Sequence, residues 1–311
     1  MVEIPVVFLM GPTASGKSEL AMALAARFPV EIVSVDSALV YRGMDIGTAK
    51  PSPALRAQIP HHLIDIRDPS ESYSAAAFCA DARRCIREIR GRGRLPLLVG
   101  GTMLYFRALQ EGLAELPDAD PALRESLNRR AAEQGWAQLH AELARVDPQS
   151  GRRIHPNDPQ RIQRALEVYY LSGQPLSELL RTSRVRGWDE VPLKWVIAPA
   201  DRDQLRRRIA QRFDTMIAQG LEQEARSLFD RRDFHPDLPA MRAVGYRQFW
   251  PYFEGKINFD TLRDNAITAT CQLAKRQMTW LRREQNARWY DSGQSDLPVR
   301  LIETLKEIGL C

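Results

Sequence analysis

Short apolar runs alternate with longer segments of helical periodicity along most of this chain. Each run predicts a buried β-strand, because it is too short for a helix. The predicted strands are residues 6–10, 31–35, 62–66, 95–99 and 193–198, and helical spacing fills segments 18–27, 74–90 and 103–110. Strands that alternate with helices in this way predict an α/β fold with a doubly wound, mostly parallel sheet, whose ligand lies at the carboxyl ends of the strands.

The pattern changes after residue 116. Residues 117–191 contain no convincing strand, and amphipathic helical spacing recurs near 121–145 and 159–171, on either side of the turn-rich sequence DPQSGRRIHPNDP. We therefore predict a helical insertion at 117–191. It separates a first part of the α/β core, at 1–116, from a second part at 192–311 that includes further helices.

The first predicted strand runs directly into a glycine-rich loop. In such a loop the glycines let successive N–H groups point at one anion, Lys17 can reach the terminal phosphates, and the Ser18 hydroxyl can hold Mg²⁺. The helix that follows directs its positive end at the same charge. An ordinary strand-to-helix turn is the alternative, but the setting favours a di- or triphosphate site. The residues that match G-x-x-x-x-G-K-[ST] are Gly11, Pro12, Thr13, Ala14, Ser15, Gly16, Lys17 and Ser18.

Polar residues also follow two other predicted strands. The second strand ends at Asp36, whose carboxylate could assist Mg²⁺ binding, act as a general base or merely cap the next turn. The loop 41–50 is typical of a segment that wraps a substrate, although a plain surface loop fits too. The strand 95–99 runs into two glycines and Thr102, where a nucleotidase would carry an aspartate. We expect open space for a substrate there, with Thr102 as a hydrogen-bonding group; a tight turn is the competing interpretation.

The segment 266–283 predicts a helix with one cationic side. Residues 239–289 carry nine basic and four acidic side chains, an excess of +5 that equals the formal charge of the whole chain. The polar side of the helix, an arc of about 120°, has no carboxylate, and its mixture of cations with Gln and Thr suits a phosphodiester backbone. A solvated surface is the alternative. The polar side consists of Thr268, Gln272, Lys275, Arg276, Thr279, Arg282 and Arg283.

Two further clusters extend this possible footprint. The sequence QRIQR at 160–164 begins a predicted helix of the insertion. The sequence RAVGYR at 242–247 combines two arginines with Tyr246, which could stack on a base. Each cluster taken alone also fits plain surface.

The bulk composition is that of a soluble globular protein. Of the 311 residues, 44% are hydrophobic and 27% are charged, so disorder is not indicated. No apolar run approaches about 18 residues and the N-terminus has no export signal, so we expect a cytoplasmic protein without a membrane partner. The four cysteines form no C-x-x-C pair, and no histidine lies at zinc spacing. We also expect a monomer.

The motifs together resemble those of the bacterial tRNA dimethylallyltransferases. The matching stretches, from residue 11 to residue 282, are GPTASGKS, DSALVYRGMDIGTAKP, GGTMLYF, QRIQRALE, RAVGYRQ and LAKRQMTWLR. The resemblance implies transfer of a dimethylallyl group from dimethylallyl diphosphate to N6 of adenosine 37, beside the anticodon of tRNAs that read codons beginning with U. It further implies that residues 11–18 hold the diphosphate with Thr13 near the reaction, and that Asp36 is the base. Thr102 would align the adenine, and Arg212 would contact the diphosphate.

The resemblance also implies contacts with the tRNA anticodon stem-loop. Leu39 departs from the family, because a number of relatives carry glutamine there and leucine cannot donate a side-chain hydrogen bond to the base. A small-molecule P-loop kinase and a nucleic-acid-binding NTPase remain alternative functions, although the missing aspartate after strand 95–99 and the cationic helix argue against the kinase. The implied tRNA contacts are Asp36, Ser37, Ala38, Leu39, Gln160, Arg161, Ile162, Gln163, Arg164, Arg242, Ala243, Val244, Gly245, Tyr246, Arg247, Lys275, Arg276, Gln277, Met278, Thr279, Trp280, Leu281 and Arg282.

Overall fold

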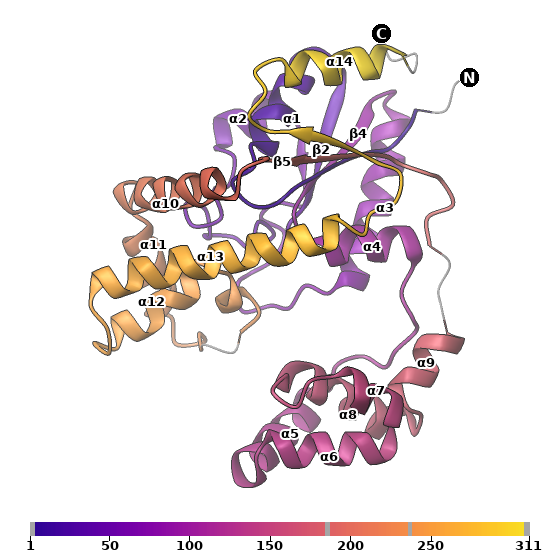
Figure 1. The fold of residues 1–311 in the computed structure, drawn as a ribbon, viewed down its shortest axis with the longest axis vertical. Coiled ribbons are helices and arrows are strands. Elements are labelled where there is room, and N and C mark those ends of the chain that lie inside the picture. Colours follow the sequence, from indigo (N-terminus) through magenta and orange to yellow (C-terminus); the bar gives the residue numbers. More distant parts are fainter. Residues whose placement is uncertain (1–3, 184–186, 236–237, 308–311) are drawn as a thin grey trace. The chain divides into compact units, whose positions relative to one another are not determined.

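A parallel β-sheet forms the centre of the fold, as the alternation of strands and helices predicts. The computed structural model describes residues 4–183, 187–235 and 238–307. The six strands pair in the order β3-β2-β4-β1-β5-β6, and every pair is parallel. The predicted fold class is therefore confirmed (Figure 1). The strands are β1 (Val7–Met10), β2 (Val30–Val35), β3 (His61–His62), β4 (Leu95–Gly100), β5 (Leu193–Ala198) and β6 (Ala287–Asp291).

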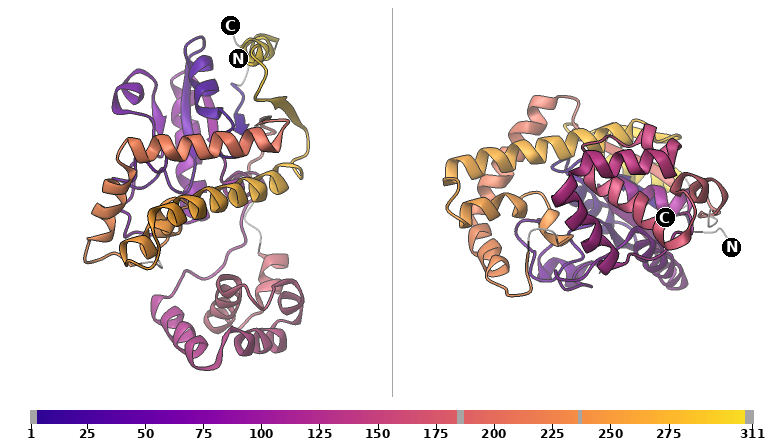
Figure 2. Two further views of the ribbon diagram at one scale, coloured as in Figure 1. Left: turned by 60° about the vertical axis from the view of Figure 1, so that its left-hand side comes forward. Right: turned by 90° about the horizontal axis from the view of Figure 1, so that it is seen from below.

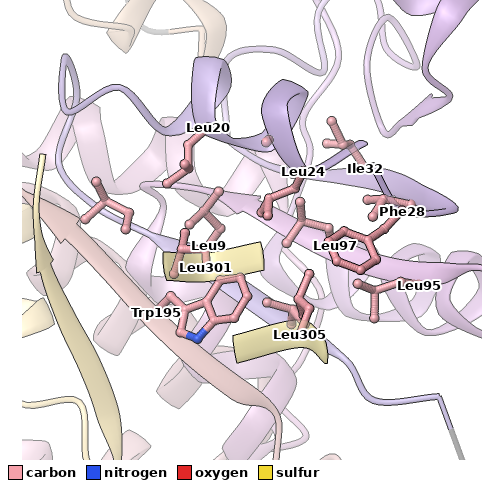
Figure 3. Packing of buried hydrophobic residues seen from close by; sticks show 14 of the residues in the cluster. Leu9, Leu20, Leu24, Phe28, Ile32, Leu95, Leu97, Trp195, Leu301 and Leu305 are labelled. Atoms are coloured by element: carbon pink, nitrogen blue, oxygen red, sulfur yellow. The ribbon is translucent and has the colours of Figure 1, made fainter. Parts of the chain in front are cut away.

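Helices cover both faces of the sheet because successive strand residues point to opposite sides. Val7 and Leu9 of β1 belong to the core formed with α1 (Lys17–Ala25) and α14 (Leu297–Glu307) (Figure 3). Phe8, between them, has its ring centroid 4.9 Å from that of Phe106, which belongs to α4 (Met103–Glu111) on the other face. The central strand β1 is thus buried from both sides, and the loop after it starts from a rigid support. The remaining helices of the N-terminal part are α2 (Pro53–Gln58) and α3 (Ala75–Gly91).

A group of helices follows β5 and belongs to the same compact unit as the sheet. Its longest member, α13, packs along α10, and the views in Figures 1 and 2 agree on this arrangement. The side chain of Asn258 caps α13 by accepting a hydrogen bond of 2.9 Å from the Thr261 N–H, so the helix begins earlier than predicted. The group comprises α10 (Arg202–Ala218), α11 (Leu221–Phe229), the short 3-10 turn η1 (Ala240–Arg242), α12 (Tyr246–Phe253) and α13 (Phe259–Leu281).

A second compact unit spans residues 109–189, while residues 1–108 and 190–311 form the first. Apolar side chains such as Leu139, Leu143 and Leu166 give this unit its own core. Its buried Glu167 accepts hydrogen bonds from Arg124 at 2.7 Å and from Arg164 at 2.6 Å. These helices fall within the segment predicted as an insertion, and the three-part division stays a prediction. They are α5 (Pro121–Gln134), α6 (Trp136–Val146), α7 (Pro148–Arg153), α8 (Pro159–Ser172) and α9 (Leu176–Thr182).

Two strands differ from the sequence-based expectation. The predicted strand 62–66 is wrong, because β3 ends at His62 and the chain then turns at Leu63 (φ 63°) and Asp65 (φ 58°). Lys50 and Arg56 bind the Asp65 carboxylate at 2.5 and 2.7 Å, which draws this segment away from the sheet. The edge strand β6 was not predicted, because its sequence ARWYD is partly exposed and has no continuous apolar run.

Candidate active site and nucleic-acid interface

The glycine-rich loop connects the central strand β1 to helix α1. A Cβ atom at Gly11 would lie 2.2 Å from the Ile197 carbonyl oxygen, so only glycine fits between β1 and β5. Ala14 (φ 59°) and Gly16 (φ 86°) take left-handed conformations that turn the chain into the helix. Ser18 lies exposed in the first turn of α1, where backbone N–H groups have no partner within the helix. The loop therefore has the form of an anion site at a helix N-terminus.

Two cations converge on this loop. The Lys17 Nζ atom donates a hydrogen bond of 2.6 Å to the Pro12 carbonyl. Burial, followed by the positive charge of Arg212, lowers the pKa of Lys17 to about 8, against opposing effects of Asp36 and Glu19. Burial also lowers the pKa of Arg212, which reaches the loop from α10. A bound anion would relieve the repulsion between these two cations.

A pocket opens beside the loop, and all its lining residues belong to the sheet-containing unit. Thr13 and Arg212 provide polar groups at its wall, and the remainder is largely apolar. A ligand with an anionic group near Arg212 could thus place a short apolar group in the pocket. The lining consists of Thr13, Ala14, Gly47, Ile209, Arg212, Phe213, Met216, Leu221, Val244, Gly245, Thr270 and Leu273.

Asp36 and Thr102 follow the neighbouring strands β2 and β4. The Asp36 Oδ1 atom accepts hydrogen bonds from the N–H groups of Ala38 and Leu39, at 2.8 and 3.3 Å. Asp36 therefore does cap the following turn, but Oδ1 alone makes these bonds. The Thr102 Oγ1 atom accepts a hydrogen bond of 3.1 Å from the Ser37 N–H. This bond fixes Thr102 next to the candidate base.

The two glycines before Thr102 do not leave the open space that the sequence suggested. A Cβ atom at Gly100 would lie 2.0 Å from the Val35 carbonyl oxygen, and one at Gly101 would lie 2.4 Å from the Gln277 Nε2 atom. That expectation is wrong, because neighbouring groups already fill the space. The glycines instead allow β4 to approach β2 and α13 closely.

Gln277 was placed in the predicted RNA-contacting stretch, but its side chain binds within the protein. Its Oε1 atom accepts a hydrogen bond of 2.9 Å from the Thr13 N–H, and its Nε2 atom donates one of 3.0 Å to the Gly101 carbonyl. A sequence signal existed: the residues three before and four after it, Ala274 and Leu281, are apolar, and both are buried in the structure. A polar residue aligned with a buried row on a helix indicates an internal partner.

The loop 41–50 is held in place by a carboxylate that the sequence analysis missed. Glu224 of α11 accepts hydrogen bonds from the N–H groups of Asp45 and Ile46, both at 2.8 Å, and of Gly47 at 3.0 Å. It also accepts one of 2.5 Å from the Tyr246 hydroxyl. Tyr246 is fully buried, so the prediction that it stacks on a base is wrong. Its ring lies against Gly47, which lines the pocket.

Replacing Glu224 by glutamine is expected to lower the free energy of unfolding by about 2–4 kcal/mol. The amide turns one acceptor oxygen into an NH₂ group that faces backbone donors. Chemical denaturation measures the change. Glu222→Gln is the matched control, because within the described residues the Glu222 side chain accepts a hydrogen bond only from the Tyr252 hydroxyl, at 3.1 Å. Equal stability of the two variants would contradict the assignment of Glu224 as the anchor of this loop.

The cationic side of α13 lies where the sequence placed it. All seven predicted polar positions are exposed, while Ile267, Ala274 and Leu281 are buried. Near the start of the helix, Arg263 is paired with Asp214 at 2.6 Å. Within the described part of the chain, the three cations predicted to bind phosphate form no ion pair with a carboxylate. These are Lys275, Arg276 and Arg282.

Several positions of the predicted RNA-contacting stretches are buried or already have partners within the protein. Ile162 and Leu281 are buried. Arg164 is paired with Glu167 and also donates to the Pro117 carbonyl at 2.7 Å, and Gln163 donates to Asn128 at 2.7 Å. The exposed positions that remain in these stretches include Gln160, Arg161, Arg242 and Arg247.

Comparison with known proteins identifies the family. Residues 39–284 match the family model described as IPP transferase. This chain belongs to the IPP transferase family. A tRNA dimethylallyltransferase from Alkalilimnicola ehrlichii is 61% identical over 96% of this chain and 94% of its own length. The resemblance to bacterial tRNA dimethylallyltransferases is thereby confirmed.

Solved structures of this family agree with the fold. A full-length tRNA isopentenylpyrophosphate transferase from Bacillus halodurans is 36% identical, covers 98% of both chains and gives a TM-score of 0.68. A eukaryotic dimethylallyltransferase described as acting on tRNA is 27% identical over 96% of this chain and 77% of its own, with a TM-score of 0.78. Among the described residues of this family member, no helix is long and apolar enough to cross a membrane.

Proposed function

We propose that this IPP transferase family member transfers the dimethylallyl group of dimethylallyl diphosphate to N6 of adenosine 37 in tRNAs that read codons beginning with U, and releases diphosphate. The observation that carries the proposal is the combination of a phosphate loop, Arg212 and a largely apolar pocket in one place. An allylic diphosphate has a charged end and a short hydrocarbon end, which match the two ends of this site. We propose that the enzyme acts as a monomer in the cytoplasm.

The reaction joins the adenine N6 atom to C1 of the dimethylallyl group as the bond between C1 and the diphosphate oxygen breaks. The electron pair of that bond leaves with the diphosphate, and one N6 proton passes to Asp36. The N6 lone pair is delocalised into the ring, so attack gains from a carboxylate that accepts the proton as the new bond forms. The adenine must also leave the anticodon-loop stack to reach the buried carbon, and Thr102 would align it.

Stabilisation of the negative charge on the leaving diphosphate is the second requirement of the reaction. Lys17, Arg212 and the N–H groups of residues 11–18 would stabilise this charge as it develops. The exposed Ser18 hydroxyl would hold Mg²⁺ beside the diphosphate, since Mg²⁺ at nucleotide phosphates is bound by few protein groups. A cluster of three metal-binding side chains is absent from the described residues. When bound, Mg²⁺ would supply further neutralisation of the diphosphate charge.

The product mixture tests the proposed function. The protein is incubated with radiolabelled dimethylallyl diphosphate and an unmodified tRNA, and the digested tRNA is analysed by mass spectrometry. We expect one inorganic diphosphate for each prenylated adenosine. In a parallel incubation with ATP, ADP together with a phosphorylated acceptor would instead identify a kinase, and nucleoside diphosphate with free phosphate would identify an NTPase.

Neutral replacement of Lys275, Arg276 and Arg282 is expected to weaken tRNA binding in a salt-dependent way. Each lost phosphate contact should reduce the slope of log K against log salt by about 0.7 to 0.9. Affinity for dimethylallyl diphosphate should not change, because these exposed side chains are not part of the pocket lining. Titrations of both ligands across a salt series provide the measurement.

The matched control is Arg263→Gln on the same helix, because Arg263 is already paired with Asp214. This variant should keep the parental salt slope. A triple variant with parental tRNA affinity and slope would mean that the cationic side of α13 is only solvated surface.

A further inference from the structure

One side chain connects the cationic helix to both catalytic loops. Gln277 projects from α13, where Arg276 precedes it directly and Lys275 lies one residue further back. Its amide accepts a hydrogen bond from the Thr13 N–H and donates one to the Gly101 carbonyl. Thr13 lines the pocket, and Gly101 is followed by Thr102. The contact thus spans the two strand ends at which donor and acceptor would meet.

The amide has little freedom to move. The Nε2 atom lies 2.4 Å from where a Cβ atom of Gly101 would stand, so even an alanine at position 101 would collide with it. The Gly11 carbonyl lies 3.1 Å from the same point, on the side of the phosphate loop. Only a side chain of this length with one acceptor and one donor satisfies both the Thr13 N–H and the Gly101 carbonyl.

We infer that Gln277 is a positioning residue that sets the placement of Thr13 relative to Thr102 and makes it depend on the position of α13. This inference rests on the proposed function. RNA phosphates bound at Lys275 and Arg276 would fix α13 and, through Gln277, both strand ends. Alignment of the donor with the adenine would then be completed only when tRNA is present.

Gln277→Met keeps the side-chain length and removes both hydrogen bonds. We expect kcat to fall by about 10- to 100-fold, because a small misplacement of reacting groups is costly, while KM for tRNA stays within about twofold. Asn265→Met, at an exposed position of the same helix, is the control and should behave as the parent. An unchanged kcat, or a loss confined to KM for tRNA, would overturn the inference.

The pH dependence of kcat in Gln277→Glu distinguishes a hydrogen-bonding role from a role that only fills space. The ionised carboxylate can accept from the Thr13 N–H but faces the Gly101 carbonyl without a proton to donate. The protonated acid can make both bonds, as the amide does. The ratio of variant to parental kcat should therefore rise as the pH falls from about 8 towards 5, whereas the Gln277→Met ratio stays flat. Equal pH dependence of the two ratios would contradict the hydrogen-bonding role.

Hydrogen exchange tests the contact without any turnover. The Thr13 amide should exchange faster in Gln277→Met than in the parent, and an anticodon stem-loop should slow this exchange only in the parent. Exchange that is independent of both the substitution and the RNA would overturn the inference. If the parent transfers no prenyl group, the proposed function fails, but the exchange experiment still tests the coupling.

Discussion

Lys17→Ala is expected to lower prenyl transfer at saturating tRNA by at least about 10³-fold, because the leaving diphosphate loses the cation of the phosphate loop. Lys17 lies in the loop after β1 and its Nζ atom also contacts the Pro12 carbonyl. tRNA affinity should remain nearly parental, since the proposed RNA contacts on α13 do not involve this side chain. Single-turnover transfer and tRNA titration measure the two quantities. Near-normal transfer would remove the loop from the mechanism.

The pH dependence of donor binding tests independently whether the charged Lys17 side chain binds the diphosphate. Burial and the charge of Arg212 lower the pKa of Lys17 to about 8 in the free protein, and a bound diphosphate would raise it. Above pH about 8, Lys17 must therefore take up a proton when the diphosphate binds. The Kd of the donor should then rise with pH by up to about tenfold per pH unit. Below that pH the lysine contributes no slope.

Calorimetry in buffers of different ionisation enthalpy measures the proton taken up on binding. Lys17→Arg is the control, because arginine stays charged throughout this range and should remove the slope. A donor Kd that is constant between pH about 7 and 10 in the parent would contradict the role of Lys17 as a titrating phosphate ligand.

Asp36→Asn should lower the single-turnover rate by about 10² to 10⁴, because the amide cannot take the N6 proton. The substitution separates the two functions that the sequence left open for this residue. Asparagine keeps an Oδ1 acceptor for the N–H groups of Ala38 and Leu39, so the turn cap seen in the structure is retained.

Two controls accompany this measurement. Thermal unfolding and the affinities for tRNA and donor should remain within a few-fold of the parent, because the size and the capping bonds are preserved. Asp36→Ala removes the cap as well and should add a loss of stability of about 1 kcal/mol. If the asparagine variant reacts at nearly the parental rate, Asp36 is a structural cap only.

The α/β class with a mostly parallel sheet and the phosphate loop could be predicted from local sequence alone. Apolar runs identified β1, β2, β4 and β5, and the fixed glycines, lysine and serine identified the loop at 11–18. The exposed side of α13 followed from helical periodicity. These features depend on residues that are close in sequence, so their physical causes are visible in a short window.

Some sequence-based predictions were nevertheless wrong. Tyr246 stands next to Arg247 and was interpreted as a base-stacking aromatic, but it is buried against Gly47 with its hydroxyl on Glu224. The strand predicted at 62–66 was lost to the ion pairs of Asp65. In each case a partner outside the short window of the pattern outweighed the local preference.

The sequence by itself thus determined the α/β class, the phosphate loop and the cationic side of α13, since periodicity and backbone conformation are local properties. Tertiary structure alone decided what Gln277 and Glu224 do. Gln277 contacts Thr13 across 264 positions of the chain, and Glu224 contacts Asp45 across 179. A polar side chain takes its role from the donor or acceptor that packing brings to it, because an unpaired buried hydrogen-bonding group is costly. That partner exists only once the distant segments have folded together.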